Sequence, residues 1–309
     1  MPSAPKHVHE TVDGHLAAIE READVAVALA AARGSRAWGA ASPDSDYDVG
    51  LVYVPTDLRR YAHLDGVTEG IVEDRGEFEY QGWDVRTFAR LLADSNEGAI
   101  DLLRSPIRYR TAYDPADLLA YIRRTYNPLD LYHTWRGIAT SNYRKYVSHH
   151  LVSTDDETFP ILDADSADGD VYTVKTDAGT RTIPADDERF TETQTKPTVK
   201  RNLTIVRAAM SARYLRETGA RGSHDLPALA FETFLCEQAP AVFDTERIDC
   251  ARELLERKRA GDGDSEIGDA VGRAFAHPAR EIDPAIHARD GPEIDRLDGF
   301  IDDLIAAVR

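Results

Sequence analysis

The sequence predicts an α+β protein, in which a small mixed sheet flanked by helices is followed by a helical C-terminal region. Short apolar or alternating segments, which are typical of strands, gather in the first third of the chain. From Asp114 onward, apolar residues recur mostly at the spacing of helices. Because domains commonly hold roughly 100–200 residues, the 309 residues divide into two expected parts, residues 1–112 and residues 113–309.

The first part is expected to combine strands with helices. Apolar side chains at a spacing of three and four residues predict a helix over 9–22. The apolar run at 24–31 predicts a buried strand, which Gly34-Ser35 ends, and the Val- and Tyr-rich run at 47–54 predicts a second strand. The remaining expected elements are a strand at 78–84, helices at 86–93 and 97–103, and a strand at 107–109.

The second part is expected to be mostly helical, with one insertion. Helices are predicted at 114–125, 129–151, 196–217, 226–236, 244–259, 264–275 and 292–308. Residues 152–195 are expected to form an insertion between two of these helices, and they hold 12 acidic residues against three basic ones. Two β-rich runs flank Asp177-Ala178-Gly179, which predicts a hairpin within the insertion.

The acidic charge of the chain allows two interpretations. The chain has 55 acidic and 37 basic residues and a net charge of −18, with 35 Asp against 20 Glu and six Lys against 31 Arg. Such a balance serves either a basic binding partner or an adaptation to high salt, in which exposed carboxylates keep a protein hydrated. The bias runs along the whole chain, which favours a halophilic adaptation. The net charge then does not argue against nucleic acid, and local basic patches decide.

Composition also excludes several classes of protein. Cys236 and Cys250 form no CxxC pair, which argues against a disulfide framework, a zinc ribbon or a redox site of the thioredoxin type. No apolar run approaches the ~20 residues that cross a bilayer, and the start of the chain lacks the apolar core of a signal peptide. We therefore expect a cytoplasmic protein with no membrane contact.

The segment from Gly34 to Val49 carries the residues of a reaction centre. Asp46 and Asp48 are two residues apart at a predicted strand, so both side chains point to one face. Paired carboxylates suit Mg²⁺, which takes further ligands from water and substrate phosphates. Free N–H groups at Gly34-Ser35, with the Ser35 hydroxyl, favour an anion. A phosphate pocket and a metal pair about ten residues apart are the parts that nucleotidyl or phosphoryl transfer needs.

Plainer interpretations of these residues stay open. The Asp-rich segment can be a solvated turn, and Ser35 can cap a helix. In the helix expected at 196–217, an apolar stripe lies beside one basic face. Lys196, Lys200 and Arg207 fall on that face. They form either a solvated flank or a contact for a triphosphate or a nucleic-acid backbone.

The wording of the segment resembles the DNA polymerase β nucleotidyltransferase superfamily. Gly-Ser, about ten residues and then Asp-x-Asp on a strand is the pattern of that superfamily. The longer Gly-Ser-Arg-Ala-Trp-Gly with Ser-Pro-Asp-Ser-Asp-Tyr-Asp-Val resembles its predicted nucleotidyltransferases of the YcgL/RlaP type, some of which are linked to RNA repair. Residues 82–88, 95–107 and 196–203 resemble later parts of this branch, so the resemblance covers about residues 9–235. The chain departs from the pattern at Gly50, where an arginine is expected, and in its long acidic insertion.

The resemblance implies a polymerase-β-like core in residues 1–112 and metal-dependent transfer of a nucleoside monophosphate from an NTP to a hydroxyl. It also implies a third carboxylate on a neighbouring strand, which we assign to Asp84, with Glu79 and Asp74 as alternatives. Asp84 can equally cap the helix that follows it. The predicted catalytic and metal-binding residues are Asp46, Asp48 and Asp84, with two Mg²⁺ ions, or Mn²⁺, as cofactor. The predicted nucleotide-binding residues are Gly34, Ser35, Arg36, Lys196, Lys200 and Arg207.

The residues alone do not specify the acceptor hydroxyl. The resemblance favours the 3′ end of a nucleic acid, RNA or DNA. A hydroxyl of a protein or of a small molecule is the alternative among enzymes. A nucleotide-binding regulator without turnover is the alternative outside enzymes, although such a protein tends to lose one of its three carboxylates.

Overall fold

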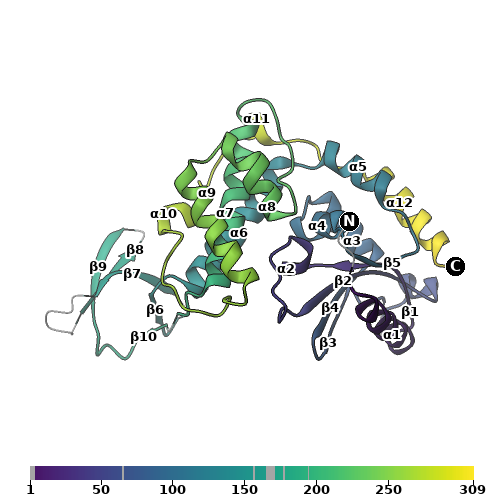
Figure 1. Cartoon of the computed structure of the whole chain (residues 1–309), viewed down its shortest axis with the longest axis horizontal. Helices are drawn as coiled ribbons and strands as arrows, with labels where there is room; N and C mark the ends of the chain where they lie inside the picture. The colour runs from purple at the N-terminus through teal and green to yellow at the C-terminus, as the bar shows by residue number, and fades with distance from the viewer. Residues whose placement is uncertain (1–3, 65, 156, 165–170, 177, 194) are drawn as a thin grey trace.

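The computed structural model describes residues 4–64, 66–155, 157–164, 171–176, 178–193 and 195–309. Asp156, residues 165–170 and Asp177, which belong to the expected acidic insertion, lie outside the described residues. Two five-stranded sheets lie at opposite ends of the molecule, with a body of helices between them (Figure 1). The described chain is therefore an α+β protein with most of its helices in the C-terminal part, as the sequence predicts.

The N-terminal sheet has the strand order β3-β4-β2-β1-β5. Its strands are β1 (Val25–Ala32), β2 (Tyr47–Pro55), β3 (Gly70–Arg75), β4 (Phe78–Asp84) and β5 (Arg108–Thr111). β2 and β4 run parallel, while the other described pairs of neighbours are antiparallel, so the sheet is mixed. The sequence predicts four of these strands, and the edge strand β3 is the one that it does not predict.

Helices cover both faces of this sheet. On one face, α1 (Lys6–Ala23) buries an apolar stripe at helical spacing. On the other face lie α3 (Val85–Ala93) and α4 (Glu97–Arg104). Alternate residues of β2 belong to the two different apolar cores, which is why β1 and β2 read as continuous apolar runs in the sequence.

A body of helices follows. The longer ones are α5 (Ala116–Thr125), α6 (Pro128–Tyr146), α7 (Val199–Gly219), α9 (Thr245–Arg259) and α12 (Ile294–Ala307). Short turns of helix are α2 (Gly34–Ala37), η1 (Leu58–Ala62), α8 (Phe231–Thr233), the π-helical η2 (Phe234–Gln238), η3 (Ala239–Ala241), α10 (Arg273–Ala276) and α11 (Pro284–His287). α6 and α7 pack along each other, and α12 returns to pack on α3. No helix of the described residues has the length and apolar character to span a membrane.

Four predicted helices differ from the structure. The helix expected at 226–236 begins only at Phe231, as α8, and continues as η2. Loops and the short α10 replace the helix expected at 264–275, because Gly268 and Gly272 adopt φ values of 73° and 81°, which interrupt a helix. The helix expected at 129–151 ends at Tyr146 and gives way to a strand. The helix expected from residue 196 begins only at Val199, since a residue that precedes a proline disfavours helical backbone.

The second sheet has the order β10-β6-β7-β8-β9 and occupies most of the expected insertion. Its strands are β6 (His150–Ser153), β7 (Thr158–Ala164), β8 (Val171–Thr176), β9 (Gly179–Pro184) and β10 (Phe190–Glu192). β8 and β9 pair antiparallel, which confirms the predicted hairpin. The core of this sheet is small and consists of Leu151, Val174 and Ile183 with a few partly buried side chains.

Candidate active site

Asp46 and Asp48 lie where the second strand of the N-terminal sheet begins. Asp48 is on β2, and Asp46 directly precedes it. The backbone N–H of Arg33, at the end of β1, donates to the carbonyl oxygen of Asp48 over 2.8 Å. This bond brings the Gly34-Ser35 turn against the strand. The predicted phosphate-binding turn and the two aspartates are therefore neighbours in space.

Gly34 allows the Asp48 carboxylate to lie directly against this turn. The φ of Gly34 is 55°, a conformation that residues with a side chain rarely adopt. A Cβ added to Gly34 would lie 1.9 Å from Oδ2 of Asp48, a distance at which no such atom fits. Any larger residue at this position must displace either the turn or the carboxylate.

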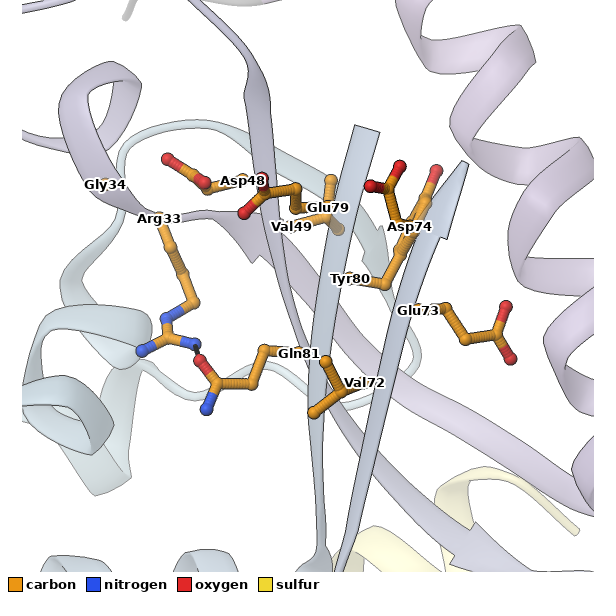
Figure 2. Close-up of a pocket in the computed structure, with 10 residues that line it drawn as sticks. All are labelled: Arg33, Gly34, Asp48, Val49, Val72, Glu73, Asp74, Glu79, Tyr80 and Gln81. Atoms are coloured by element: carbon orange, nitrogen blue, oxygen red, sulfur yellow. Dashed lines mark hydrogen bonds between the residues drawn. The ribbon is translucent and has the colours of Figure 1, made fainter. Parts of the chain in front are cut away.

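A third carboxylate lies beside Asp48 on the neighbouring strand. In the parallel pairing of β2 with β4, Asp48 is opposite Glu79, and paired residues of adjacent strands point to the same face. Figure 2 shows the two carboxylates together at the end of the sheet next to Gly34. Burial and then the charge of Glu79 raise the pKa of Asp48, and Asp46 adds to this rise, while two nearby arginines act in the opposite direction. The repulsion among these acids is the kind that a bound cation relieves.

Asp84, predicted to be the third carboxylate, does not lie with this group. It ends β4, five residues beyond Glu79, which is roughly 16 Å along a strand. The odd separation also turns its side chain toward the opposite face of the sheet. Asp84 is buried, its Oδ1 accepts from the N–H of Arg86 over 3.0 Å, and its Oδ2 accepts from the hydroxyl of Tyr61 over 2.6 Å. Asp84 is thus the N-cap of α3, and Glu79 is the carboxylate of β4 that lies beside Asp48.

A cavity of about 460 Å³ opens beside Asp48 and Glu79. Asp74 of β3, the other alternative for the third carboxylate, is paired with Glu79 and lines the same cavity. Among the described residues, no three His, Cys, Asp or Glu side chains are grouped closely enough to hold a metal ion by themselves. Two crowded aspartates nevertheless fit Mg²⁺, because this ion keeps several waters and takes further ligands from substrate phosphates.

Two lysines face the aspartates across a second cavity. Lys200 of α7 and Lys258 of α9 line this cavity of about 340 Å³ together with Ser35 and both aspartates. Its wall combines two ammonium groups and a hydroxyl with the carboxylates. Ammonium and hydroxyl groups can bind a triphosphate by charge-assisted hydrogen bonds, and a pair of aspartates can hold a metal ion, so the wall has the groups that both ligands need.

Lys258 is a residue of this cavity that the sequence interpretation missed. Its Nζ donates to Oγ of Ser45 over 2.9 Å, although the two residues are 213 positions apart in the sequence. Burial, and then the neighbouring charge of Lys200, lower the pKa of Lys258. The available signal was the basic run Arg257-Lys258-Arg259 at the end of a predicted helix, in a chain that has six lysines.

Arg36 holds the loop that carries the aspartates. Its Nε donates to the carbonyl oxygen of Asp46 over 3.1 Å, and its guanidinium also donates to the carbonyl oxygen of Ser45. The same guanidinium stacks 3.6 Å from the centre of the Tyr47 ring. These contacts fix the backbone from Ser45 to Tyr47, so the role of Arg36 in the structure is to shape the loop.

Arg33 explains the departure from the family pattern at Gly50. The guanidinium of Arg33 donates to the side chain of Gln81 (Figure 2) and lies 4.8 Å from the centre of the Trp83 ring. A Cβ at Gly50 would lie 2.4 Å from Cδ of Arg33. The missing side chain at Gly50 therefore makes room for Arg33, and burial lowers the pKa of this guanidinium.

Lys196 and Arg207 differ from Lys200 in their surroundings. Lys196 is exposed and precedes α7, so it does not share the helix face on which the sequence places it. The side chain of Arg207 is 12% exposed and pairs with Asp101 at 2.9 Å and with Glu97 at 3.7 Å. It also lies within 5.0 Å of the centres of two tryptophan rings. Its charge is compensated inside the protein, which leaves Lys200 as the member of the trio that lines the cavity with the aspartates.

Comparison with known proteins identifies relatives of the chain. A relative of 32% identity over 131 residues is the uncharacterized protein YcgL of Bacillus subtilis (strain 168). That match covers 42% of this chain and 50% of the relative, so it spans half of the relative's length. No solved structure matches the chain. Residues 8–304 match the family described as RlaP, RNA repair pathway DNA polymerase beta family, and the chain therefore belongs to this family.

Proposed function

We propose that the protein transfers a nucleoside monophosphate from an NTP to the 3′ hydroxyl of an RNA. The observation that carries this proposal is the position of Asp48, which lies beside Glu79 of the parallel neighbouring strand and lines one cleft with Asp46, Lys200 and Lys258. Membership of a DNA polymerase β family supports nucleotidyl transfer, and the RNA repair pathway in the family's description supports RNA as the acceptor.

The residues of the cleft divide the work of this reaction. Lys200, Lys258 and Ser35 bind the triphosphate through charge-assisted hydrogen bonds. Glu79, in the place expected for Asp84, accepts the proton of the acceptor hydroxyl, whose oxygen attacks the α-phosphorus. The bond between the α-phosphorus and the bridging oxygen of the β-phosphate breaks, and pyrophosphate leaves.

Asp46 and Asp48 are the residues that would hold Mg²⁺ or Mn²⁺, with Glu79 beside them. Such ions, when bound, stabilise the charge on the attacking and leaving oxygens. The raised pKa of Asp48 supports this role, because the repulsion behind it is relieved when a cation binds. Gly34 keeps the turn close to the aspartates, so that phosphate and metal positions stay adjacent.

The full chain is tested with each labelled NTP, Mg²⁺ or Mn²⁺, and single-stranded RNA in molar KCl. Label that reaches the RNA with the natural chain, but not with Asp48→Asn, is the expected result. Label on DNA, on the protein itself or on a small alcohol would replace RNA as the acceptor. Binding of NTP without transfer to any of these would identify a nucleotide-binding regulator and refute the proposal.

A further inference from the structure

The lysines of this acidic chain are concentrated in one region. Five of the six lie between residues 145 and 258, in a protein of net charge −18. Two of them, Lys200 and Lys258, line the cleft described above. A third, Lys145, lies in the last turn of α6, next to the first turn of α7. Three of the six lysines therefore lie in the cleft or on the helix pair beside it.

Tyr146 and Arg201 form a stacked pair at the junction of α6 and α7, with the guanidinium over the ring. The guanidinium carbon of Arg201 lies 3.7 Å from the centre of the Tyr146 ring, and Nζ of Lys145 lies 5.0 Å from it. Both members of the pair are partly exposed. Lys200 has an acidic partner, Asp264, at 2.5 Å, whereas Lys145 and Arg201 have none in the part of the chain that the structure describes. The pair thus presents an aromatic ring together with an arginine that has no salt-bridge partner among the described residues.

This pair is close to the cleft. Arg201 follows Lys200, which lines the same cavity as Asp46. Asp264, at the rim of that cavity, has its pKa lowered first by its hydrogen bond with Lys200 and also by the charges of Lys258 and Arg201. The charge of Arg201 therefore acts on a carboxylate that lines the cleft, and Tyr146 lies beside Arg201.

A separate groove holds three further cations. Arg144, Lys175 and Arg273 line this groove of about 730 Å³, which α6, α10 and the second sheet border. The lower end of α6 lies beside the second sheet in Figure 1. Arg144 directly precedes Lys145 in the last turn of α6, so this groove borders the helix end that carries Lys145.

We propose that Lys145, Tyr146 and Arg201, here named the α6–α7 surface, bind the RNA strand immediately behind the 3′ end that enters the cleft. This inference rests on the proposed function and deepens it. The two cations neutralise backbone phosphates. A base stacks on the stacked pair, because unpaired RNA bases stack on aromatic rings and on guanidinium planes.

The test measures binding of a fluorescently labelled single-stranded RNA by anisotropy at several KCl concentrations. Tyr146→Ala and Arg201→Ala should each weaken binding about 5- to 100-fold, and Tyr146→Phe should bind like the natural chain. Arg201→Ala should also reduce the slope of log affinity against log salt by about 0.7, whereas Tyr146→Ala should leave the slope unchanged. Arg124→Ala removes an exposed cation from α5 and is the matched control, with RNA affinity unchanged. The affinity for NTP should be unchanged in all four variants.

Unchanged RNA affinity in both alanine variants, or an equal loss in Arg124→Ala, overturns the inference. If an alanine variant fails to fold by circular dichroism, Arg201→Lys keeps the charge and removes the plane, so it should lose affinity and keep the salt slope. Because binding needs no turnover, the two proposals fail separately. RNA binding that depends on Tyr146 and Arg201 without label transfer refutes the proposed function, and transfer to RNA with unaffected binding refutes the α6–α7 surface.

Discussion

The acidic residues at the two ends of the β2–β4 strand pair have opposite surroundings. At one end, Asp84 is buried, and both of its oxygens accept hydrogen bonds, from the N–H of Arg86 and the hydroxyl of Tyr61. At the other end, Asp48 and Glu79 lie side by side, and this contact contributes to the raised pKa of Asp48. A buried acid with its hydrogen bonds satisfied stabilises the fold. Crowded acids destabilise it in the absence of a cation, and such sites are typical of function.

Among the variants that compare the two ends, the largest expected effect is a loss of label transfer from NTP to RNA when Asp46 or Asp48 is replaced. Asp48→Asn and Asp46→Asn should reduce transfer by on the order of 10²–10³ or more, because a neutral amide stabilises little of the charge in the transition state. Both proteins should remain folded by circular dichroism, since each loses a repelling charge. Near-normal turnover in either variant would contradict the assignment of the aspartates as metal ligands.

A second pair of variants tests the exchange of roles between Glu79 and Asp84. Glu79→Gln should lower the rate of transfer at least tenfold and leave the free energy of unfolding nearly unchanged. Asp84→Asn should keep transfer at 25 °C and lower the free energy of unfolding by about 1 kcal/mol, because its Oδ1 still caps α3 but its amide NH2 cannot accept the hydrogen bond from the Tyr61 hydroxyl. Rates with labelled NTP and urea unfolding of both proteins provide the measurement. The reverse pattern would restore Asp84 as the third carboxylate.

β4 illustrates which features of the site can be predicted from the sequence and which cannot. Its alternation predicts the strand at 78–84, and the Asp-x-Asp spacing predicts the shared face of Asp46 and Asp48, because both are local patterns. The parallel register that brings Glu79 to Asp48 depends on how two strands with a third one between them in the chain meet in space. A register of this kind cannot be read from either strand alone. The family resemblance pointed to Asp84 instead. The carboxylate of Asp84, however, caps α3 and accepts its hydrogen bonds from Arg86 and Tyr61.

The same limit applies to Lys258 and to the second sheet. Lys258 meets Ser45 only because α9 packs on α7 and thus reaches the cleft, a contact 213 residues apart in the sequence. The strands of the second sheet share a core of three fully buried side chains, so their apolar pattern is too weak to predict more than the β8–β9 hairpin. α7, in contrast, is long and buried, and its helical pattern is evident from the sequence.

Replacing two glycines by alanine should have smaller effects, which are opposite in sign for Gly34 and Gly137. Gly34→Ala should reduce transfer at least tenfold, because its Cβ would displace the Asp48 carboxylate and its φ of 55° is unfavourable for alanine. Gly137→Ala is the matched control on α6, where nothing lies within 4 Å of the added Cβ. It should keep transfer and raise the free energy of unfolding by about 0.5–1 kcal/mol. Equal activity of the two variants would show that the turn and the carboxylate are not in close contact.

Salt should act on the exposed acids rather than on either end of the strand pair. With 55 acidic residues, self-repulsion destabilises the fold in dilute buffer, and salt screens it. The melting temperature should therefore rise by several degrees between about 0.1 and 2 M KCl. Asp84→Asn and the natural chain should show the same rise, because the Asp84 bonds are buried. A flat curve would make the acidity specific and favour a basic binding partner.

The smallest expected effect is a gain in stability from Asp48→Asn in the absence of metal. The pKa of Asp48 is raised in the folded protein, so the folded state binds its proton more tightly than the unfolded chain, and the ionised carboxylate destabilises the fold at neutral pH. The variant should therefore melt about 1–3 °C above the natural chain at pH 7. This difference should shrink as the pH falls toward about 4, where the carboxylate of the unfolded chain is also protonated. Millimolar Mg²⁺ should reverse the order, because the cation binds and stabilises only the protein that keeps the aspartate. Calorimetry of both proteins with and without Mg²⁺ measures this reversal, and Asp84→Asn, which melts lower under every condition, is the control from the other end of the strand pair.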